Sequence, residues 1–198
     1  MSHYFDQTPA GPSRPRQVEL ALPDLRVQLT ADRGVFAGSG VDLGTVELLR
    51  TVPIGPDPAG ALLDLGCGYG PIAVALATRF PASTVWAVDV NTRAVELAGA
   101  NAAALGLANV RAVVPDDVPP DVRFAQIWSN PPIRIGKAAL HELLERWLAR
   151  LAPGGTAWMV VQKNLGSDSL AGWLRSTGFD VARLASRKGY RILEVRGR

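Results

Sequence analysis

The chain has 198 residues, 47% of them hydrophobic and 20% charged, which is the composition of an ordinary folded protein long enough to bury a full core. Disorder along the whole chain is thereby excluded. The formal net charge of +3 and the sequence pI of about 9.4 allow a polyanionic partner, although an excess this small is equally common on proteins that bind none.

Residues suited to disulfides or metal sites are scarce. Cys67 is the only cysteine, so no intramolecular disulfide forms. The two histidines, His3 and His141, lie far apart in the sequence, which argues against a zinc site. Residues 1–20 lack the apolar segment of a signal peptide, and no later stretch approaches the length of a membrane span. We therefore expect a cytoplasmic protein with neither a metal nor a membrane partner.

The N-terminal part predicts a flexible arm followed by a short extension. Residues 1–16 are rich in proline and polar groups, which is typical of an arm. In the extension, residues 17–58, "VELALPDLRVQLTADRG" alternates apolar and polar positions on both sides of Pro23 and Asp24, which predicts two short strands and a turn. "VDLGTVELLRTV" then has helical spacing. We expect this extension to be an addition to the core, residues 59–198, rather than a second domain.

Within the core, short apolar segments alternate with segments of helical length. Strands are expected at "ALLDL", "TVWAVDV", "NVRAVV", "FAQIWS" and "TAWMVVQ". Pro71, Asn91 and Ser167 are suited to begin three of the intervening helices. The helix in "KAALHELLERWLARL" is predicted to bury one stripe, made of Leu140, Leu143, Leu144, Trp147, Leu148 and Leu151.

The end of the chain departs from this alternation. "FDVARLAS" and "YRILEVR" are separated only by "RKG", which predicts a hairpin and an antiparallel last strand. The whole pattern predicts a doubly wound, Rossmann-like α/β fold, with a seven-stranded, mostly parallel sheet and an antiparallel C-terminal strand. In such sheets ligands bind beyond the carboxyl ends of the strands, so we expect the functional residues in the loops that follow them.

The first two of these loops carry glycines and an acidic residue. In "DLGCGYG", Gly66, Gly68 and Gly70 let the backbone turn tightly and bring its N–H groups to a ligand at a helix N-terminus, although such glycines can also serve a turn alone. After the second strand, Asp89 stands where a carboxylate accepts hydrogen bonds from ribose hydroxyls. The alternative roles of Asp89 are a solvated strand end or a helix cap, and Asn91 is better placed as the cap.

The third and fourth loops carry candidates for the two ends of a nucleoside ligand. In "PDDVPPD", Asp116 or Asp117 could accept from an adenine amino group, or both could belong to a solvated turn. In "SNPP", Asn130 precedes Pro131 and Pro132, and each proline fixes its φ angle and lacks a backbone donor, so the chain turns here on a rigid mount. A nucleoside held by the first three loops would present its far end to Asn130.

"LDLGCGYGPIAVALA", "VDVN", "SNPP" and the closing hairpin resemble class I S-adenosylmethionine-dependent methyltransferases. More narrowly, "DRGVFAGSGVDLGTVELL", "NPPIRIGK", "VVQKNLGSDSLAGWL" and "KGYRILEV" resemble the methyltransferase domain of the ribosomal small-subunit (16S rRNA) guanine-N2 methyltransferases and their stand-alone relatives, over residues 18–196. The resemblance implies S-adenosylmethionine as the cofactor, small-subunit ribosomal RNA as the partner and the exocyclic N2 amine of a guanine as the methyl acceptor.

The resemblance also implies roles for individual residues. As catalytic residues, Asn130 and Pro131 would offer oxygens to the two N–H hydrogens of the amine, and Pro132 would help hold them rigidly, so that catalysis is mostly alignment. An unpaired or flipped base is required. The cofactor would be bound by Asp64, Gly66, Cys67, Gly68, Asp89, Val90, Asp116, Asp117 and Asn130. The substrate would be bound by Ile133, Arg134, Lys137 and Lys163. Apart from the resemblance, the basic residues could converge around the mouth as phosphate contacts or could simply be solvated, and they are Arg134, Lys137, Lys163, Lys188 and Arg191.

Several alternatives accompany this interpretation. A nicotinamide enzyme also uses glycines and an acidic residue, but Pro71 stands where its fingerprint has a third glycine. Ile133 occupies a position where many amine-methylating relatives carry an aromatic residue for stacking. A protein glutamine or a small-molecule amine is therefore an alternative acceptor. A non-catalytic RNA-binding or assembly factor with the same fold is the alternative of another class, and the intact Asn130 motif argues against it. The oligomeric state stays open.

Overall fold

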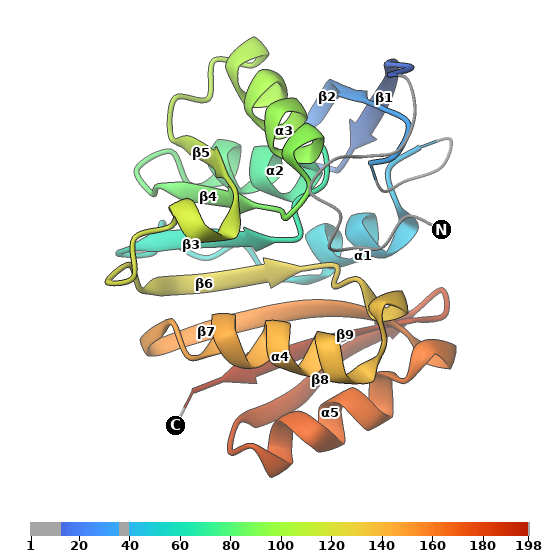
Figure 1. Cartoon of the computed structure of the whole chain (residues 1–198), viewed down its shortest axis with the longest axis vertical. Coiled ribbons are helices and arrows are strands. Elements are labelled where there is room, and N and C mark those ends of the chain that lie inside the picture. Colours follow the sequence, from blue (N-terminus) through green and yellow to red (C-terminus); the bar gives the residue numbers. More distant parts are fainter. Residues whose placement is uncertain (1–12, 36–39, 198) are drawn as a thin grey trace.

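A seven-stranded sheet forms the centre of the computed structural model, which describes residues 13–35 and 40–197. Its strands are β3 (Ala61–Leu65), β4 (Val85–Val88), β5 (Val110–Val113), β6 (Phe124–Ser129), β7 (Leu151–Gln162), β8 (Asp180–Arg187) and β9 (Tyr190–Arg196). They are arranged in the order β5-β4-β3-β6-β7-β9-β8, from the upper part of Figure 1 to the lower part. All pairs are parallel except the two made by β9. The predicted fold class is confirmed.

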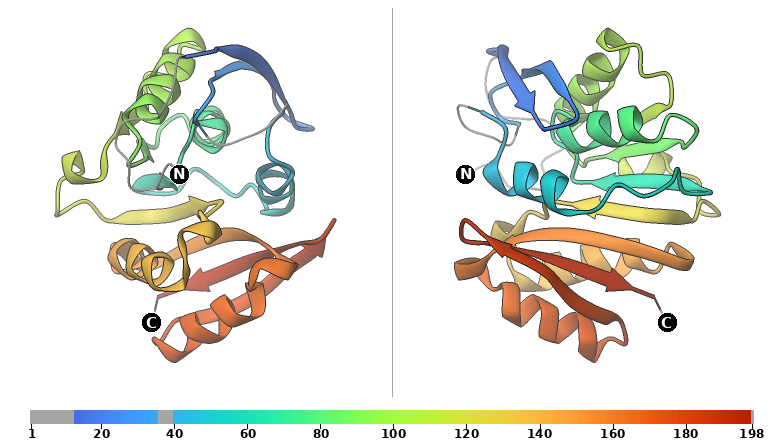
Figure 2. Two further views of the ribbon diagram at one scale, coloured as in Figure 1. Left: turned by 45° about the vertical axis from the view of Figure 1, so that its right-hand side comes forward. Right: turned by 180° about the vertical axis from the view of Figure 1, so that it is seen from behind.

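Helices cover both faces of this sheet (Figures 1 and 2). They are α1 (Leu43–Thr51), α2 (Pro71–Arg79), α3 (Thr92–Ala104), α4 (Lys137–Leu148) and α5 (Ser167–Ser176), with three short 3₁₀ turns, η1 (Pro115–Asp117), η2 (Ile133–Ile135) and η3 (Lys163–Leu165). One hydrophobic core lies between the sheet and α1, α2 and α3, and the other lies between the sheet and α4 and α5. The chain is thus doubly wound.

The alternation of side chains along β3 determines which face Asp64 occupies. Leu62 contributes to the core beneath α2, whereas Leu63 and Leu65 contribute to the opposite core. Because side chains alternate between the two faces, Asp64 lies on the same face as Leu62. There its Oδ2 accepts a hydrogen bond from the backbone N–H of Ala73 at 2.9 Å, in the first turn of α2. The strand therefore stabilises the start of the helix that follows it.

Two of the three predicted helix starts are confirmed. Pro71 is the first residue of α2, and the Asn91 side chain caps α3. The prediction that Ser167 caps α5 is wrong. Gly166 occupies the cap position with a φ angle of 93°, a left-handed conformation that favours glycine, so Ser167 becomes the first helical residue and its hydroxyl is buried.

The predicted stripe on α4 is confirmed except at its last member. Leu140, Leu144, Trp147 and Leu148 are buried, and Leu143 is partly buried. Leu151 is not on the helix, because β7 already begins there and pairs with Phe124 of β6. Gly155 permits this longer strand, since a Cβ at that position would lie 2.9 Å from the Phe124 carbonyl oxygen.

The predicted closing hairpin is confirmed and is tighter than expected. Arg187 still belongs to β8, so only Lys188 and Gly189 link the two strands. Their φ angles are 48° and 82°, as required by a two-residue turn with both central residues left-handed.

The N-terminal extension contains the two predicted strands, β1 (Arg16–Ala21) and β2 (Arg26–Ala31), which pair antiparallel as a separate small sheet. This hairpin lies beside α3 in both views of Figure 2. Residues 1–12, which make up most of the predicted arm, lie outside the described residues.

Asn101 of α3 joins the hairpin to the rest of the molecule. Its Oδ1 accepts from the backbone N–H of Thr30 at 2.8 Å, and its Nδ2 donates to the carbonyls of Thr30 at 2.9 Å and of Tyr69 at 2.8 Å. The side chain is buried, so truncation would leave several backbone groups without partners.

We expect Asn101→Ala to lower the free energy of unfolding by about 3 kcal/mol, because buried groups that lose a partner keep their desolvation cost. Urea denaturation monitored by circular dichroism would measure the change. The matched control is Asn164→Ala, at an exposed asparagine, which should stay within about 0.5 kcal/mol of the wild type. A similarly small loss for Asn101→Ala would contradict this role.

Candidate cofactor and catalytic site

A pocket opens beyond the carboxyl ends of β3, β4 and β6. The strand order reverses here, because β4 follows β3 on one side of it and β6 returns to the other side. The pocket is lined by Asp42, Thr45, Gly66, Cys67, Gly68, Tyr69, Pro71, Ile72, Asp89, Asn130 and Pro132. The structure therefore brings together the glycine-rich loop, the acidic residue after β4 and the Asn-Pro-Pro segment, as the sequence predicted.

The glycine-rich loop differs from the expectation in how its N–H groups are used. The N–H groups of Gly66 and Cys67 donate to the Val88 carbonyl at 2.8 and 3.0 Å, and that of Gly68 donates to Asp89 Oδ2 at 3.0 Å. The prediction that the loop glycines offer their N–H groups to a ligand is thus wrong for Gly66 and Gly68, and also for Gly70, whose N–H donates to the Cys67 carbonyl at 2.9 Å. A dinucleotide pyrophosphate needs such donors, so their internal use also argues against a nicotinamide enzyme.

Asp89 is held rigidly at the rim of the pocket. Its Oδ2 accepts from Gly68, and its Oδ1 accepts from the backbone N–H of Asn91 at 3.0 Å. Its residue surface is only 9% exposed, and this burial raises the pKa of Asp89 although the hydrogen bonds from Asn91, Gly68 and Val90 act to lower it. Each carboxylate oxygen has more than one acceptor site, so the group can still accept from hydroxyl groups.

Asp64 lies beneath the pocket and does not line it. The residue is fully buried, and burial raises the pKa of Asp64 to about 8, with the charge of Asp89 adding to the effect. Its Oδ1 has no hydrogen-bond partner within the described ranges. Two buried carboxyl groups, one on β3 and one directly after β4, fit a cofactor that carries an ammonium group and a ribose diol, because Asp64 Oδ1 has no partner and an ammonium beside it would favour its ionised form.

Cys67 behaves as a packing residue. Burial raises the pKa of the Cys67 thiol well above its ordinary value, and its Sγ lies 3.5 Å from the Gly68 carbonyl oxygen, to which it donates. A neutral thiol is a poor nucleophile, so the side chain contributes to the pocket wall rather than to covalent chemistry.

The end of β6 forms a rigid mount for Asn130. The Ser129 hydroxyl donates to the Leu65 carbonyl at 2.8 Å and ties this strand end to β3. Pro132 has φ −76° and ψ 73°, and the N–H of Ile133 donates to the Pro131 carbonyl at 2.8 Å, which is the geometry of an inverse γ-turn. One acceptor site of the Pro131 carbonyl is therefore used inside the turn, and one is left.

The amide of Asn130 is oriented by two residues of the N-terminal extension. Its Nδ2 donates to Asp42 Oδ1 at 2.8 Å and to Thr45 Oγ1 at 3.1 Å. Because a carboxylate only accepts, the amide must turn its NH₂ group toward Asp42. Its Oδ1 then lies on the other side, and no described residue donates to it. The arrangement presents an acceptor of fixed orientation at the pocket.

Asp42 and Thr45 were not identified from the sequence, although "DLGT" carries a local signal. Asp42 caps α1 by accepting from the Thr45 N–H at 3.2 Å. Gly44 lets this turn pack against β9, since a Cβ there would lie 2.8 Å from the Tyr190 ring. The residue type of Asp42 indicates a helix cap, but it does not reveal that Asn130 is a further partner.

The predicted adenine contacts lie outside the pocket. Asp116 and Asp117 belong to η1 and are exposed. The Asp116 side chain is 87% exposed, and its Oδ1 accepts from Arg146 at 3.0 Å. This ion pair favours the solvated turn for Asp116, while the contact from Asp117 stays a prediction. Val90 directly follows Asp89 and is partly buried.

The predicted substrate contacts divide into two groups. Arg134, Lys137 and Lys163 are exposed in the segments that follow β6 and β7, on the same edge as the pocket. Ile133 is partly buried and packs against the core beneath α4, so it does not offer a flat surface to a base.

Lys188 and Arg191 lie at the same edge, because the N–H of Lys163 donates to the Gly189 carbonyl at 2.8 Å and Arg191 pairs with Val161 of β7, but both side chains have acidic partners. Lys188 pairs with Glu47 at 2.8 Å. Arg191 is 8% exposed and pairs with Asp168. Both cations are therefore engaged within the protein.

Within the described ranges, no group of three or more histidine, cysteine or acidic side chains could hold a metal ion. Across the same ranges, no helix is long and apolar enough to cross a membrane.

The fold and the pocket define the class of protein, a class I S-adenosylmethionine-dependent methyltransferase. The model of the methyltransferase small domain family matches residues 26–194, and the chain belongs to that family. It is an S-adenosylmethionine-dependent enzyme.

Three similar proteins illustrate this membership. YbxB of Bacillus subtilis is 36% identical over 197 residues, which cover 98% of each chain. Ribosomal RNA small subunit methyltransferase C of Pseudomonas aeruginosa is 35% identical over 169 residues, 81% of this chain and 50% of that protein. The T. thermophilus 16S rRNA N2 G1207 methyltransferase (RsmC), solved in complex with AdoMet and guanosine, superposes with a TM-score of 0.74 at 25% identity, covering 94% of this chain and 52% of that one. The chain thus spans about half the length of these two ribosomal RNA methyltransferases.

Proposed function

We propose that the protein transfers the methyl group of S-adenosylmethionine to the exocyclic N2 amine of a guanine in small-subunit ribosomal RNA. The observation that carries this proposal is the orientation of Asn130, whose amide oxygen is directed away from Asp42 and Thr45 at the pocket. The similarity to ribosomal RNA small subunit methyltransferase C, and to a relative solved with guanosine, supports the same substrate class. A ribosomal substrate would place the enzyme in the cytoplasm.

The proposed chemistry depends on two fixed acceptors. An exocyclic amine is a weak nucleophile because its lone pair is delocalised into the ring. Asn130 Oδ1 and the remaining acceptor site of the Pro131 carbonyl can receive its two N–H hydrogens, which favours a pyramidal nitrogen with a localised lone pair. The bound cofactor supplies an electrophilic methyl group on its sulfonium. The protein residues contribute alignment and matched hydrogen bonds. As the amine nitrogen bonds the methyl carbon, the carbon–sulfur bond breaks with its electron pair on sulfur, which leaves a neutral thioether, and the nitrogen releases one proton to water.

The cofactor would be held by the first two loops. Asp89 would accept from the ribose hydroxyls, and Asp64, from beneath the pocket, would favour the ammonium of the methionine moiety. The guanine must be unpaired or flipped out of a helix to reach the pocket. Arg134, Lys137 and Lys163 would contact neighbouring phosphates from the same edge of the sheet.

We expect Thr45→Val to lower kcat roughly five- to tenfold, because one hydrogen bond that orients Asn130 is removed, the equivalent of about 1 kcal/mol. The KM for S-adenosylmethionine should stay unchanged, since Asp89 and the glycine-rich loop are untouched. Thr45→Ser, which keeps the hydroxyl, should restore most of the rate. A Thr45→Ser enzyme as slow as Thr45→Val would show that packing, rather than the hydrogen bond, matters at this position.

Methyl transfer from labelled S-adenosylmethionine to deproteinised small-subunit ribosomal RNA tests the proposed function directly. We expect labelled N2-methylguanosine in the nucleoside digest, identified by mass spectrometry. A glutamine-containing peptide and small-molecule amines serve as competing acceptors. Label in the peptide or amine but none in the RNA would show that one of these alternative acceptors, rather than guanine, is the substrate.

A further inference from the structure

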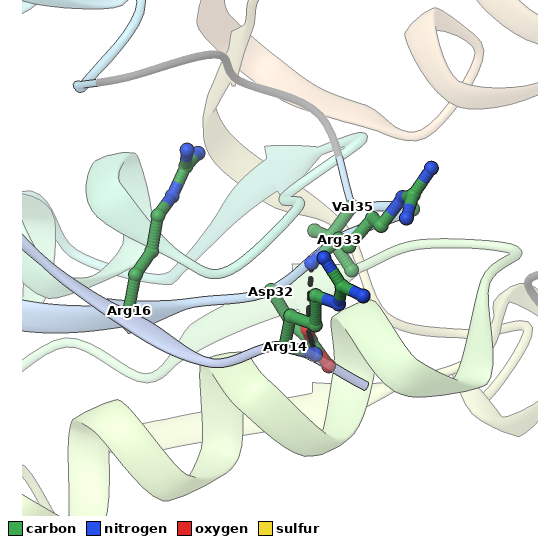
Figure 3. Close-up of a pocket in the computed structure, with 6 residues that line it drawn as sticks. Arg14, Arg16, Asp32, Arg33 and Val35 are labelled. Atoms are coloured by element: carbon green, nitrogen blue, oxygen red, sulfur yellow. Dashed lines mark hydrogen bonds between the residues drawn. The ribbon is translucent and has the colours of Figure 1, made fainter. Parts of the chain in front are cut away.

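A second, more open cleft lies on the N-terminal extension, where the β1–β2 hairpin meets the segment that follows β2. It has a volume of about 460 Å³ and is lined by Arg14, Arg16, Asp32, Arg33, Gly34 and Val35. We call it the arginine cleft. In Figure 3 the guanidinium groups of its three arginines extend toward the same side of the hairpin. All three arginines are exposed.

The charges of the arginine cleft do not cancel. Asp32 is only 4% exposed, and its carboxylate is already hydrogen-bonded within the protein. Its Oδ1 accepts from the backbone N–H groups of Arg14 at 2.5 Å and Arg33 at 2.6 Å. Arg93 of α3 adds another cation, 3.9 Å from Asp32 and donating to the Arg33 carbonyl. In the described part of the chain, the side chains of Arg14 and Arg33 have no acidic partner.

This positive charge is concentrated relative to the rest of the protein. The four arginines and Asp32 carry a net charge of +3 in total, which equals the formal charge of the whole chain, so the remaining residues sum to zero. A planar guanidinium donates two parallel hydrogen bonds to a phosphate, and arginine is therefore the residue best suited to bind it.

The arginine cleft adjoins the cofactor pocket. Asn91 donates from Nδ2 to the Gly34 carbonyl at 3.2 Å, and Asn91 is two residues after Asp89. Tyr69 lines the cofactor pocket, and burial raises its pKa to about 12, while the charge of Arg16 acts in the opposite direction. A polyanion bound in the arginine cleft would thus lie beside the mouth of the pocket.

We propose that the arginine cleft binds the phosphodiester backbone of the RNA whose base enters the methyl-transfer pocket. The inference rests on the proposed function and extends it, because it assigns RNA recruitment to the N-terminal extension in addition to the exposed basic residues after β6 and β7. Phosphate contacts of this kind position a nucleic acid without reading its sequence.

The test compares the double variant Arg14→Gln/Arg33→Gln with the control Arg26→Gln. Arg26 is an exposed arginine at the opposite end of the same hairpin. We expect the double variant to bind deproteinised small-subunit ribosomal RNA about tenfold more weakly, and its plot of log K against log salt to be shallower by about 1.4, or about 0.7 for each phosphate that an arginine no longer neutralises. Affinity for S-adenosylmethionine, measured by calorimetry, should match the wild type. Arg26→Gln should leave all of these quantities unchanged.

Three other outcomes would contradict the proposed role of the arginine cleft, and the measurements distinguish them from one another. Equal RNA affinity and salt dependence in the double variant and Arg26→Gln would remove the arginine cleft from RNA binding while leaving the proposed function intact, provided the wild type methylates the RNA. Weaker binding of S-adenosylmethionine in the double variant, with RNA binding preserved, would assign the cleft to the cofactor. A wild type that neither binds nor methylates the RNA would overturn both proposals.

Discussion

Asn130→Ala is expected to lower kcat for RNA methylation by about 10²–10³-fold, the usual cost of removing one preorganised hydrogen-bonding group from a reaction centre. The substitution removes the oxygen that would accept from the amine, and it also leaves Asp42 and Thr45 without the amide they now bind. Because the hydrogen bonds of the Asn130 amide go to Asp42 and Thr45 rather than to Asp89 or the glycine-rich loop, the affinity for S-adenosylmethionine should change little.

Single-turnover kinetics with labelled cofactor would measure the loss for Asn130→Ala, and calorimetry would confirm that the cofactor still binds. Gln28→Ala, which removes an exposed amide from the β1–β2 hairpin, is the matched control and should retain the wild-type rate. Asn130→Asp should be at least as slow as the alanine variant, because it places a second carboxylate against Asp42. A methylation rate within tenfold of the wild type in Asn130→Ala would remove this residue from the reaction centre.

The parts of the site that the sequence predicted depend on short-range signals. Glycines after a strand, an acidic residue at the end of the next strand and Asn130 before two prolines are each encoded within a few residues. The alternation of strands and helices then places these loops on one edge of a sheet. Asn91 could be identified as a cap for the same reason, since the hydrogen bonds it accepts come from the residues that directly follow it.

The parts that could not be predicted depend on contacts between distant residues. Asp42 and Thr45 are 88 and 85 residues away from Asn130 in the sequence, and only the packing of α1 against the sheet brings them to it. The same holds for Asn101, whose bonds to Thr30 span 71 residues. The use of the loop N–H groups was missed because their acceptors, Val88 and Asp89, belong to the neighbouring strand end.

Local patterns were also overridden where two residues competed for one position. Ser167 is a good helix cap by residue type, but Gly166 can adopt the left-handed conformation that the end of η3 requires, so the helix begins one residue earlier, at Ser167 itself. Lys188 and Arg191 illustrate a related limit: their charges are evident in the sequence, whereas their partners Glu47 and Asp168 lie on helices that only the fold brings near.

Asp89→Ala is expected to weaken the binding of S-adenosylmethionine about ten- to a hundredfold, or roughly 1.5–3 kcal/mol, because the ribose hydroxyls lose charged acceptors. The carboxylate also receives the N–H groups of Gly68 and Asn91, so its removal loosens the loop against which the cofactor would rest. Asp89→Asn should not restore full affinity, since its NH₂ group would face one of these two N–H donors. Calorimetric titration of each variant with the cofactor measures the effect.

The control for Asp89→Ala is Asp121→Ala, at an exposed acidic residue away from the pocket, which should leave the affinity unchanged. A decrease in kcat at saturating cofactor is expected to be small, because Asp89 accepts from Gly68 and Asn91 whereas the Asn130 amide donates to Asp42 and Thr45. The two substitutions therefore separate the two ends of the pocket: Asp89→Ala should act mainly on the dissociation constant of the cofactor, and Asn130→Ala mainly on the rate of transfer. Unchanged cofactor affinity in Asp89→Ala would mean that the carboxylate serves only to hold the glycine-rich loop against β4.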